Sequence, residues 1–273
     1  MTEIRKNVPL ANFTRFQAGG AAEFFFEPES VGELASFLRS NSGPVHVLGL
    51  GSNVLVRDGV VKGTTIRLAR LAGIGSQGGD IVAEAGVPDS LLATKAPGFE
   101  FLACIPGSIG AALLTNAGCF GREVRDIVIS ADLMDVADGR IRTFLKDELG
   151  LGYRSSKIPK GAIVIRVRLR GGGKGESIAD MLKKKNAVQP TGAKTAGSVF
   201  KNPPGRSAWR LVADAGMQGA RLGGAEVSRL HANFIVNLGG ATSADIAALM
   251  ALVQERVRER FGVELEPEIR FLP

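Results

Sequence analysis

Apolar and polar residues repeat along this chain with two periods, and each period predicts its own kind of element. Residues 161–170 alternate, with Ile163 and Ile165 on one face and Arg166 on the other, which predicts a half-buried strand. In residues 244–261 the apolar side chains recur every three or four positions, which predicts an amphipathic helix. Helices and strands are therefore mixed along the chain.

Capping and turn residues mark the ends of further elements. Ser30 followed by Glu33 has the form of a capping box, so a short helix is predicted to begin between them. The Asp-Gly pair at 138–139 is favoured in tight hairpin turns, because it tolerates the positive φ that these turns need. Residues 127–136 and 140–144 are therefore predicted to pair as a hairpin.

The other predicted elements end at Gly, at Pro or at a capping residue. They are strands at 44–48, 54–56 and 231–238, helices at 177–188 and 208–215, and the helix at 244–261 with Thr242 or Ser243 as its cap and Gly262 at its end. These elements follow no regular βαβ repeat, so the predicted fold class is α+β rather than a doubly wound sheet.

Composition sets the broad class of protein. With 273 residues and 45% hydrophobic content, the chain can form one large or two modest packed domains. The best apolar run, 101–114, is broken by Pro106 and two glycines, so no membrane span is predicted. The amino terminus has no leader pattern, which predicts a cytoplasmic location. Two cysteines and two histidines without metal-ligand spacing predict neither a disulfide framework nor a metal site.

The net charge of +7 favours an anionic partner. The basic residues are spread along the chain, and a single Trp and a single Tyr offer little surface for stacking bases. A small phosphorylated ligand is therefore favoured over nucleic acid. The oligomeric state is not predicted.

Glycine-rich residues 171–175 form the strongest candidate linker, and a boundary near Pro190 fits the end of the helical pattern before it. The predicted division of the chain is 1–68, 69–173, 174–262 and a final strand at 263–273.

Two glycine-rich loops, 49–53 and 105–110 with its continuation to 121, are candidates for binding a pyrophosphate. Backbone N–H groups exposed by glycine geometry, with Ser and Asn side chains, can form a neutral anion cradle. Tight turns packed against helices are the alternative interpretation of each loop. Neither loop has the Rossmann or the P-loop pattern, which disfavours classical dehydrogenases and mononucleotide kinases.

Three distant side chains could carry chemistry on an anionic substrate. Ser198 supplies a hydroxyl that can donate a proton, and Glu268 supplies a carboxylate. Arg154 supplies a guanidinium that can clamp a carboxylate through two hydrogen bonds. For each of the three, the alternative is a polar loop residue without a functional role. His231 is as consistent with packing as with function.

Seven blocks of the sequence, in the same order, resemble the bacterial UDP-N-acetylenolpyruvoylglucosamine reductase family. The blocks are 13–20, 49–55, 105–121, 152–156, 197–203, 223–228 with 231–234, and 265–270. Between Arg154 and Pro190 there is room for one strand and one helix, which resembles the type II enzymes of this family.

This resemblance implies a flavoenzyme. Segments 1–68 and 69–173 are expected to hold non-covalent FAD in a fold of the vanillyl-alcohol-oxidase type, and segment 174–262 is expected to bind substrate. By this resemblance, NADPH is expected to reduce the flavin, and hydride is then expected to pass from flavin N5 to the methylene carbon of the UDP-linked enolpyruvyl group, which would give UDP-N-acetylmuramate. The resemblance assigns stabilisation of the resulting negative charge to Arg154 and Glu268.

The remaining roles also follow from the resemblance. Ser198 is expected to protonate the α-carbon, and Glu268 to act protonated or through a hydrogen bond to the carboxylate. The expected FAD-binding residues are Gly49, Gly51, Ser52, Asn53, Pro106, Gly107, Ser108, Gly110, Asn116, Gly118 and Gly121. The expected substrate-binding residues are Tyr153, Lys185 and Asn202.

Departures from the family pattern occur at Cys104, Cys119 and Phe120, where the family usually has Gly, Ala and Tyr. We expect them to modulate FAD affinity without abolishing it. Two other functions stay open on sequence: a flavin oxidase of the same superfamily, and a non-catalytic protein that binds nucleotides or nucleic acid.

Overall fold

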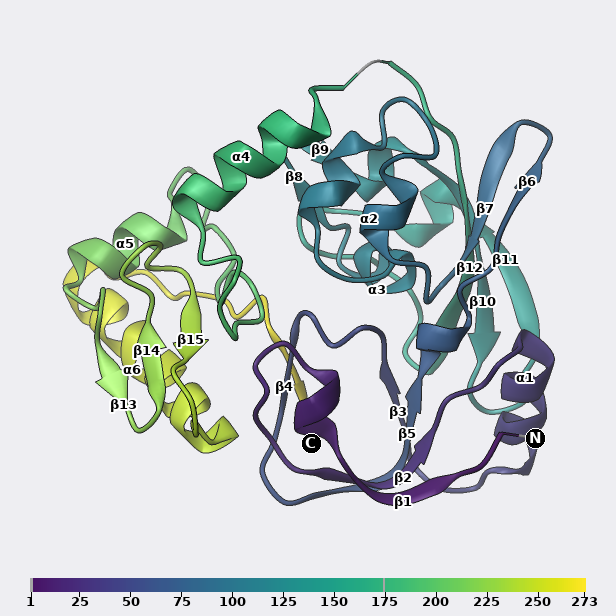
Figure 1. Ribbon diagram of the computed structural model, residues 1–273, viewed down its shortest axis with the longest axis horizontal. Coiled ribbons are helices and arrows are strands. Elements are labelled where there is room, and N and C mark those ends of the chain that lie inside the picture. The colour runs from purple at the N-terminus through teal and green to yellow at the C-terminus, as the bar shows by residue number, and fades with distance from the viewer. Residues whose placement is uncertain (1, 174) are drawn as a thin grey trace. The chain divides into compact units, whose positions relative to one another are not determined.

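The chain folds into two compact units, as shown by a computed structural model that describes residues 2–173 and 175–273 (Figure 1). The first unit comprises Met1–Lys6, Phe24–Leu50 and Gly63–Lys184, and the second comprises Asn7–Glu23, Gly51–Lys62 and Lys185–Pro273. Lys174, where the third predicted segment begins, lies outside the described residues. The four-part division of the chain stays a prediction.

A five-stranded antiparallel sheet is the main element of the first unit. Its order is β11 (Ile141–Leu145), β10 (Val128–Asp135), β12 (Ala162–Leu169), β7 (Asp80–Glu84) and β6 (Ile74–Gln77). The predicted hairpin is confirmed, because β10 and β11 pair antiparallel and Gly139 in their turn has a φ of 69°. The alternating strand is confirmed as β12, with Ile163 and Ile165 buried.

The apolar face of this sheet is covered by α3 (Ile109–Leu114), which packs against β12 and β7 (Figure 1). Phe99 and Leu102 from the segment before α3 are fully buried in the same core. The short helix α2 (Asp89–Leu92) contacts the 3-10 helix Glu100–Cys104 in this region. The core of the first unit therefore lies directly under the second predicted glycine loop.

Helix α1 (Val31–Ser40) begins where the sequence predicts. The Ser30 hydroxyl accepts a hydrogen bond from the Glu33 amide at 3.1 Å, which is half of a capping box. The Glu33 carboxylate accepts from the Glu29 amide at 2.8 Å, one residue before the position that a capping box uses. The helix start is confirmed, and the reciprocal bond is shifted by one residue.

A second core lies in the C-terminal part of the chain, between a helix pair and a small sheet. The long helix α6 (Ser243–Phe261) packs against α5 (Ala208–Asp214) and against β13 and β14. The sheet has the order β13 (Arg221–Leu222), β14 (Ala225–Val227) and β15 (Ile235–Asn237). Thr242 is the cap of α6, through a reciprocal pair with Asp245, and Gly262 ends it with a φ of 64°.

The predicted strand at 231–238 is wrong at its start, because the strand begins at Ile235, preceded by an isolated bridge from Phe234 to Ser198. The Ser228 hydroxyl accepts hydrogen bonds from the amides of Leu230 and His231, and the Phe234 amide donates to His231 O. These bonds fold the first half of the predicted strand into turns, because a serine hydroxyl offers nearby backbone an alternative to a ladder.

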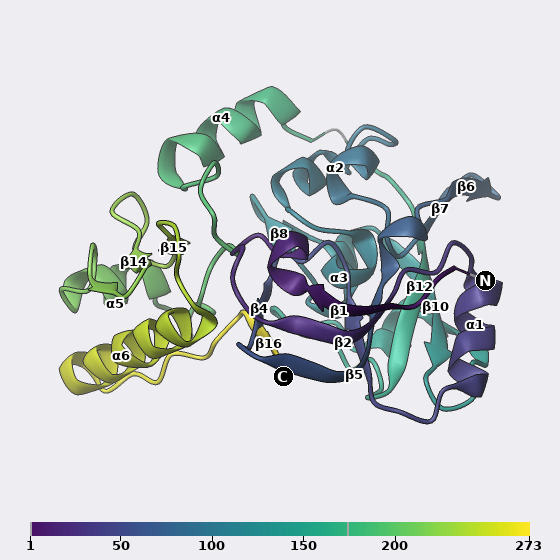
Figure 2. The same cartoon turned by 60° about the horizontal axis from the view of Figure 1, so that its bottom comes forward.

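The remaining elements complete the α+β architecture. One sheet, visible in Figure 2, has the strand order β1 (Arg5–Pro9), β2 (Ala21–Phe26), β5 (Val60–Arg67) and β3 (Val45–Leu48). Two further strand pairs are β4 (Val54–Val56) with β16 (Arg270–Leu272), which are parallel, and β8 (Gly118–Cys119) with β9 (Arg122–Glu123). The last element is helix α4 (Ile178–Val188). Among the described residues, no helix is both long and apolar enough to cross a bilayer.

Candidate active site

The two predicted glycine loops meet in the first unit. Gly49 follows β3. Ser108 is the N-cap residue of α3, makes no side-chain cap bond and is 1% exposed. A Cβ atom added at Gly49 would lie 3.1 Å from Ser108 Oγ and 3.6 Å from the Ala111 side chain. The absence of a side chain at Gly49 therefore leaves open the space beside the Ser108 hydroxyl.

The second loop is tied to the segment that follows β7. The Asp89 amide donates to Gly107 O at 3.1 Å, and the Gly110 amide donates to Ala85 O at 3.0 Å. A Cβ atom at Gly110 would lie 2.6 Å from Ala85 Cβ, closer than real side-chain contacts allow. Gly110 therefore holds the loop against the end of the sheet, which is a packing role that the sequence pattern does not distinguish from ligand binding.

Asp89 is a buried carboxyl group that the sequence did not indicate. It is 0% exposed, and neither carboxylate oxygen has a hydrogen-bond partner among the described residues. Burial raises the pKa of Asp89 well above its usual value, because the charged form loses solvation. The Asp89 carboxyl group, whose neutral form burial favours, belongs to the residue whose backbone amide binds Gly107 O.

The rest of the first glycine loop belongs to the second unit. Gly51 has a φ of 67°, and its carbonyl accepts from the Arg15 amide at 3.0 Å. The Asn53 side-chain amide donates to Glu268 O at 3.1 Å, and the Arg270 amide donates to Asn53 O at 3.1 Å. Asn53 therefore joins the loop to the backbone that carries Glu268.

Ser198 and Glu268 are placed by a backbone ladder in the second unit. The Val199 amide donates to Asn233 O, and the Glu268 amide donates to Val199 O, both at 2.8 Å. The side chain of Asn233, which is buried, also bonds both backbone groups of Phe200. The structure thus brings the backbone segments of two predicted catalytic residues together, and both residues are half-buried.

Two predicted substrate ligands lie elsewhere in the second unit. The side-chain oxygen of Asn202 accepts from the Ala208 amide at 2.9 Å and so satisfies the first amide of α5, whose N-cap residue is Ser207. Lys185 is half-buried in the last turn of α4. Their contacts with substrate stay predictions, as do the FAD contacts of the loop residues.

Arg154 lies on a tight turn in the first unit. Gly152 and Ser155 exchange backbone hydrogen bonds at 3.1 and 3.3 Å, so Tyr153 and Arg154 form the tip. Arg154 has a φ of 48°, a left-handed conformation that side chains with a Cβ rarely adopt. Its guanidinium donates to Gly118 O at 2.7 Å and packs 5.2 Å from the ring of Tyr153, which is 47% exposed.

A carboxylate missed by sequence reasoning completes this cluster. Glu123 Oε1 lies 3.7 Å from Arg154 Nη1, and Glu123 Oε2 lies 2.8 Å from Arg125 Nε. Asn116 is fully buried, and its amide nitrogen donates to Glu123 at 2.9 Å and to Gly152 O at 2.8 Å. Glu123 follows the matching block 105–121 by two residues, so the only available signal was its closeness to that block.

Comparisons with known proteins agree along the whole chain. Residues 22–145 match the FAD binding domain family, and residues 189–272 match the C-terminal domain of UDP-N-acetylenolpyruvoylglucosamine reductase. Proteins of that name from Gluconobacter oxydans (strain 621H) and Acidiphilium cryptum (strain JF-5) are 43% and 44% identical to the chain. The alignments cover 98% and 97% of the chain, and 91% and 89% of the relatives.

This chain belongs to the UDP-N-acetylenolpyruvoylglucosamine reductase family. The crystal structure of such a reductase (MurB) from Thermus caldophilus matches with a TM-score of 0.85 and 34% identity, covering 100% of both chains. The resemblance and the α+β fold class predicted from sequence, an FAD-binding region plus a C-terminal domain, are therefore confirmed.

Within the first unit of this reductase-family chain, the space between Gly49 and Ser108 is compatible with an FAD pyrophosphate. Gly49 leaves room beside Ser108, and residues 49–53 and 105–110 include no acidic side chain that would repel an anion. Neutral backbone N–H groups and hydroxyls are the donors expected in such a cradle.

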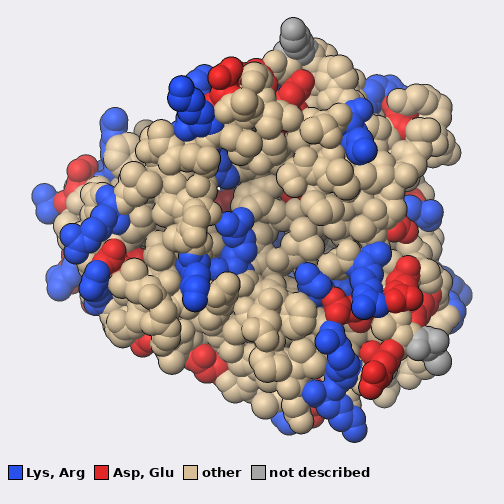
Figure 3. All heavy atoms as spheres, in the orientation of Figure 1, with Lys and Arg blue, Asp and Glu red and all other residues tan. Residues whose placement is uncertain are grey.

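Figure 3 shows Lys and Arg dispersed among Asp and Glu over the face drawn, without one continuous basic stripe.

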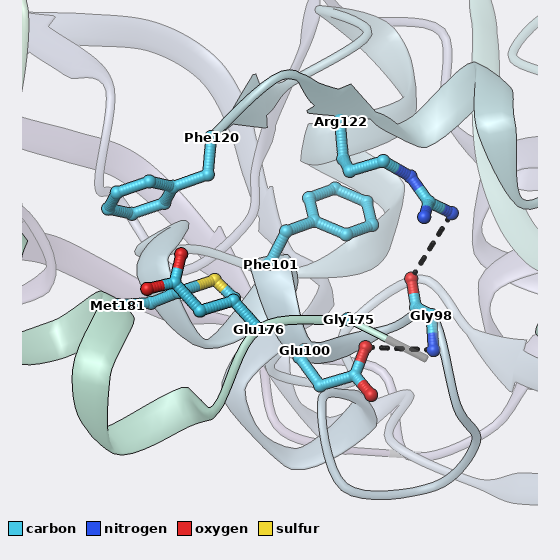
Figure 4. A pocket seen from close by; sticks show the side chains of 8 residues that line it. All are labelled: Gly98, Glu100, Phe101, Phe120, Arg122, Gly175, Glu176 and Met181. Carbon is cyan, nitrogen blue, oxygen red and sulfur yellow. Dashed lines mark hydrogen bonds between the residues drawn. The ribbon is translucent and has the colours of Figure 1, made fainter. Parts of the chain in front are cut away.

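The departures from the reductase pattern are accommodated locally. Cys104 is 3% exposed within the core of the first unit. Phe120 has a φ of 51° and borders a pocket of about 60 Å³ that Phe101 and Arg122 also line (Figure 4). The Cys119 thiol contacts Phe101 O at 3.2 Å. Their effect on FAD affinity stays a prediction.

His231 is packed rather than poised for proton transfer. Burial lowers its pKa, so the neutral ring is favoured. Its ring packs edge-on to Phe234, with centroids 4.9 Å apart, and its Nδ1 accepts from the Asn233 amide at 3.3 Å. These contacts support the packing interpretation of His231.

Proposed function

We propose that this chain reduces UDP-N-acetylenolpyruvoylglucosamine to UDP-N-acetylmuramate for peptidoglycan synthesis, with FAD as cofactor and NADPH as reductant. The observation that carries the proposal is identity of 43% over 98% of the chain with a reductase of that name. The FAD binding domain match at 22–145 supports an oxidoreductase that uses a flavin.

FAD, when bound, supplies transfer of a hydride equivalent from NADPH to the methylene carbon of the substrate. The chain would hold the cofactor non-covalently through the predicted residues. They are Gly49, Gly51, Ser52, Asn53, Pro106, Gly107, Ser108, Gly110, Asn116, Gly118 and Gly121. The open space between Gly49 and Ser108 supports this assignment.

We assign Arg154 to the substrate carboxylate. Addition of hydride to the methylene carbon leaves negative charge on the α-carbon, and delocalisation carries that charge into the adjoining carboxylate. A guanidinium that binds the carboxylate through two hydrogen bonds stabilises the charge as it develops. The left-handed backbone at Arg154 supports a functional role, since such strain concentrates at functional sites.

Ser198 and Glu268 complete the assignment. The Ser198 hydroxyl donates a proton to the α-carbon, which completes the saturated lactyl group. Glu268 acts on the substrate carboxylate, either as the protonated acid or through a hydrogen bond to that carboxylate. The ladder that brings their backbone segments together supports a shared role. Tyr153, Lys185 and Asn202 are the proposed substrate contacts.

The domain roles and location follow the same proposal. Segments 1–68 and 69–173 bind FAD, 174–262 binds substrate, and 263–273 carries the catalytic Glu268. A cytoplasmic location suits an enzyme that consumes NADPH and a nucleotide-linked sugar. The two family matches, at 22–145 and 189–272, support the order of these roles along the chain.

Product identification tests the proposed function. Purified protein loaded with FAD is mixed with NADPH and UDP-N-acetylenolpyruvoylglucosamine, and the product is analysed by mass spectrometry. We expect one NADPH consumed for each substrate, and a product heavier than the substrate by two hydrogens. Protein that binds no FAD, or that oxidises NADPH without changing the sugar nucleotide, would contradict the proposal.

A further inference from the structure

We propose that Glu123 is a positioning residue that sets the orientation of the Arg154 guanidinium, and that Asn116 locks both groups in place. This inference rests on the role proposed above for Arg154. Glu123, Asn116, Gly118 and Arg154 are named here the Arg154 cluster, and all belong to the first unit.

The guanidinium of Arg154 is held at two different nitrogen atoms. Nη2 donates to Gly118 O at 2.7 Å, and Nη1 lies 3.7 Å from Glu123 Oε1. Together with the covalent attachment of the group through Nε, these two contacts give three points, and three points define the plane of the guanidinium. A guanidinium binds a carboxylate through two parallel hydrogen bonds only when its plane faces that carboxylate. Glu123 therefore controls the property on which the proposed role of Arg154 depends.

Glu123 is itself fixed, and this distinguishes it from a mobile surface partner. Its side chain is 16% exposed, and it accepts from Asn116 Nδ2 at 2.9 Å and contacts Arg125 Nε at 2.8 Å. The second N–H of the same Asn116 amide donates to Gly152 O at 2.8 Å. One buried amide thus anchors both the carboxylate and the turn on which Arg154 sits.

Gly118 adds a packing constraint on the same carboxylate. It pairs with Glu123 across the two-residue hairpin of β8 and β9. A Cβ atom at Gly118 would lie 2.7 Å from Glu123 Cγ. The missing side chain at Gly118 therefore leaves the space that the Glu123 side chain occupies, while its carbonyl receives Arg154.

The backbone of Arg154 shows why the cluster needs several contacts. A φ of 48° is costly for arginine, and strained conformations persist only where the surrounding structure over-determines them. The bonds from Asn116 to Gly152 O and from Arg154 to Gly118 O hold the backbone of Arg154 in this conformation. Glu123 links these two bonds into one cluster.

Rapid-mixing measurements on the FAD-loaded Glu123→Gln variant test the inference, because glutamine keeps the size of the side chain and removes its charge. We expect NADPH to reduce the flavin at a rate within about twofold of wild type. Reoxidation by saturating enolpyruvyl substrate should slow by about 10- to 100-fold, as expected for a misplaced catalytic group. Glu123→Asp keeps the charge on a shorter side chain, so its reoxidation rate should lie between those of wild type and Glu123→Gln.

Glu27→Gln is the matched control. Glu27 lies in the same unit, its side chain is 10% exposed, and it pairs with Arg5 and Arg67. It has no proposed part in substrate or FAD binding, so both half-reactions should keep wild-type rates. If Glu123→Gln also reoxidised at the wild-type rate, or if it slowed both half-reactions equally, the positioning role would be overturned.

A double-mutant cycle with Arg154→Lys separates this inference from the proposed function. We expect Arg154→Lys alone to slow reoxidation, and adding Glu123→Gln to slow it by no more than about twofold further, because the two changes remove one interaction. Full, additive losses would overturn the positioning role alone. An Arg154→Lys variant that reoxidises normally would overturn the proposed role of Arg154 and this inference with it.

Discussion

In the first unit the position of Arg154 depends on the side chains of Glu123 and Asn116 as well as on the carbonyl of Gly118. In the second unit the segments of Ser198 and Glu268 are held mainly by backbone hydrogen bonds. The Arg154 cluster depends on one carboxylate and one buried amide. The Ser198 and Glu268 segments are joined through Val199, with Asn53 and Asn233 adding amide contacts at the edges.

This difference between side-chain and backbone contacts predicts where single substitutions should change the catalytic rate. A backbone ladder survives the loss of most side chains, because its donors and acceptors belong to the main chain. A side-chain cluster loses its geometry when one member is changed, since the remaining polar groups are left without partners. Residues that do no chemistry should therefore affect catalysis more in the first unit than in the second.

The largest effect is expected from Ser198→Ala, which removes the proposed proton donor and leaves the ladder intact. NADPH should reduce the flavin normally, while reoxidation by the enolpyruvyl substrate should slow by about 10²-fold or more. Rapid mixing under anaerobic conditions measures both rates. Ser207→Ala is the control, since Ser207 is a half-buried serine of the same unit with no side-chain cap bond. Equal slowing of both half-reactions would make Ser198 structural.

The next effect concerns the strained turn, and a pair of variants isolates it. Arg154→Ala and Arg154→Gly remove the same contacts, but only glycine adopts a φ of 48° without cost. We expect the glycine variant to have the larger free energy of unfolding by about 1–2 kcal/mol, measured by denaturant titration. At Arg166, within β12, the same two substitutions should show the opposite order. A glycine variant less stable than the alanine variant at 154 would refute the strain.

A smaller effect is expected from Asn53→Ala. This change removes the side-chain bond to Glu268 O, which contributes about 1 kcal/mol, but the Arg270 amide still donates to the backbone of residue 53. With saturating FAD, reoxidation should stay within about threefold of wild type, since a tenfold loss requires about 1.4 kcal/mol of barrier. A loss as large as that of Glu123→Gln would erase the contrast between the two regions.

The smallest effect on catalysis is expected from Asp89→Asn, whose effect is on stability. Because burial raises the pKa of Asp89, the folded protein keeps this proton at pH values where the unfolded chain has lost it. The contribution of Asp89 to stability is thus fully present below the usual pKa of 3.8 and is lost as pH rises toward the raised pKa.

The neutral amide that Asp89→Asn introduces does not titrate, so this variant should gain stability relative to wild type as pH rises from about 4. Thermal unfolding of both FAD-free proteins across a pH series measures the difference. The difference between the two melting temperatures should be constant at the acid end and should move in favour of the variant as pH rises. A difference independent of pH would show that Asp89 titrates normally in the folded protein.

The sequence predicted those helices and strands whose ends are marked by capping, turn or alternating residues within the element itself. The alternation of 161–170 and the Thr242 and Gly262 ends of α6 are each encoded within a few neighbouring residues. The predicted strand at 231–238 failed at its start because the Ser228 hydroxyl captures nearby amides, which is a contest between two local structures that the pattern cannot rank.

The candidate site was only partly predictable for the same reason. Ser198, Glu268 and Arg154 could be singled out by residue type and by the resemblance. Glu123 could not, because its role depends on Asn116 and on a turn at 152–155 that lie close only after folding. The β8–β9 hairpin was also missed, since its turn places Phe120 at a positive φ, where glycine or asparagine is usual.

The central claim is that this chain passes a hydride from NADPH to an enolpyruvyl group in two separable half-reactions. Its most direct test is to reduce the FAD-loaded protein with one equivalent of NADPH without oxygen, and then to add UDP-N-acetylenolpyruvoylglucosamine. The account predicts full return of the oxidised flavin spectrum with one equivalent of UDP-N-acetylmuramate formed. A flavin that stays reduced until oxygen is admitted would contradict it.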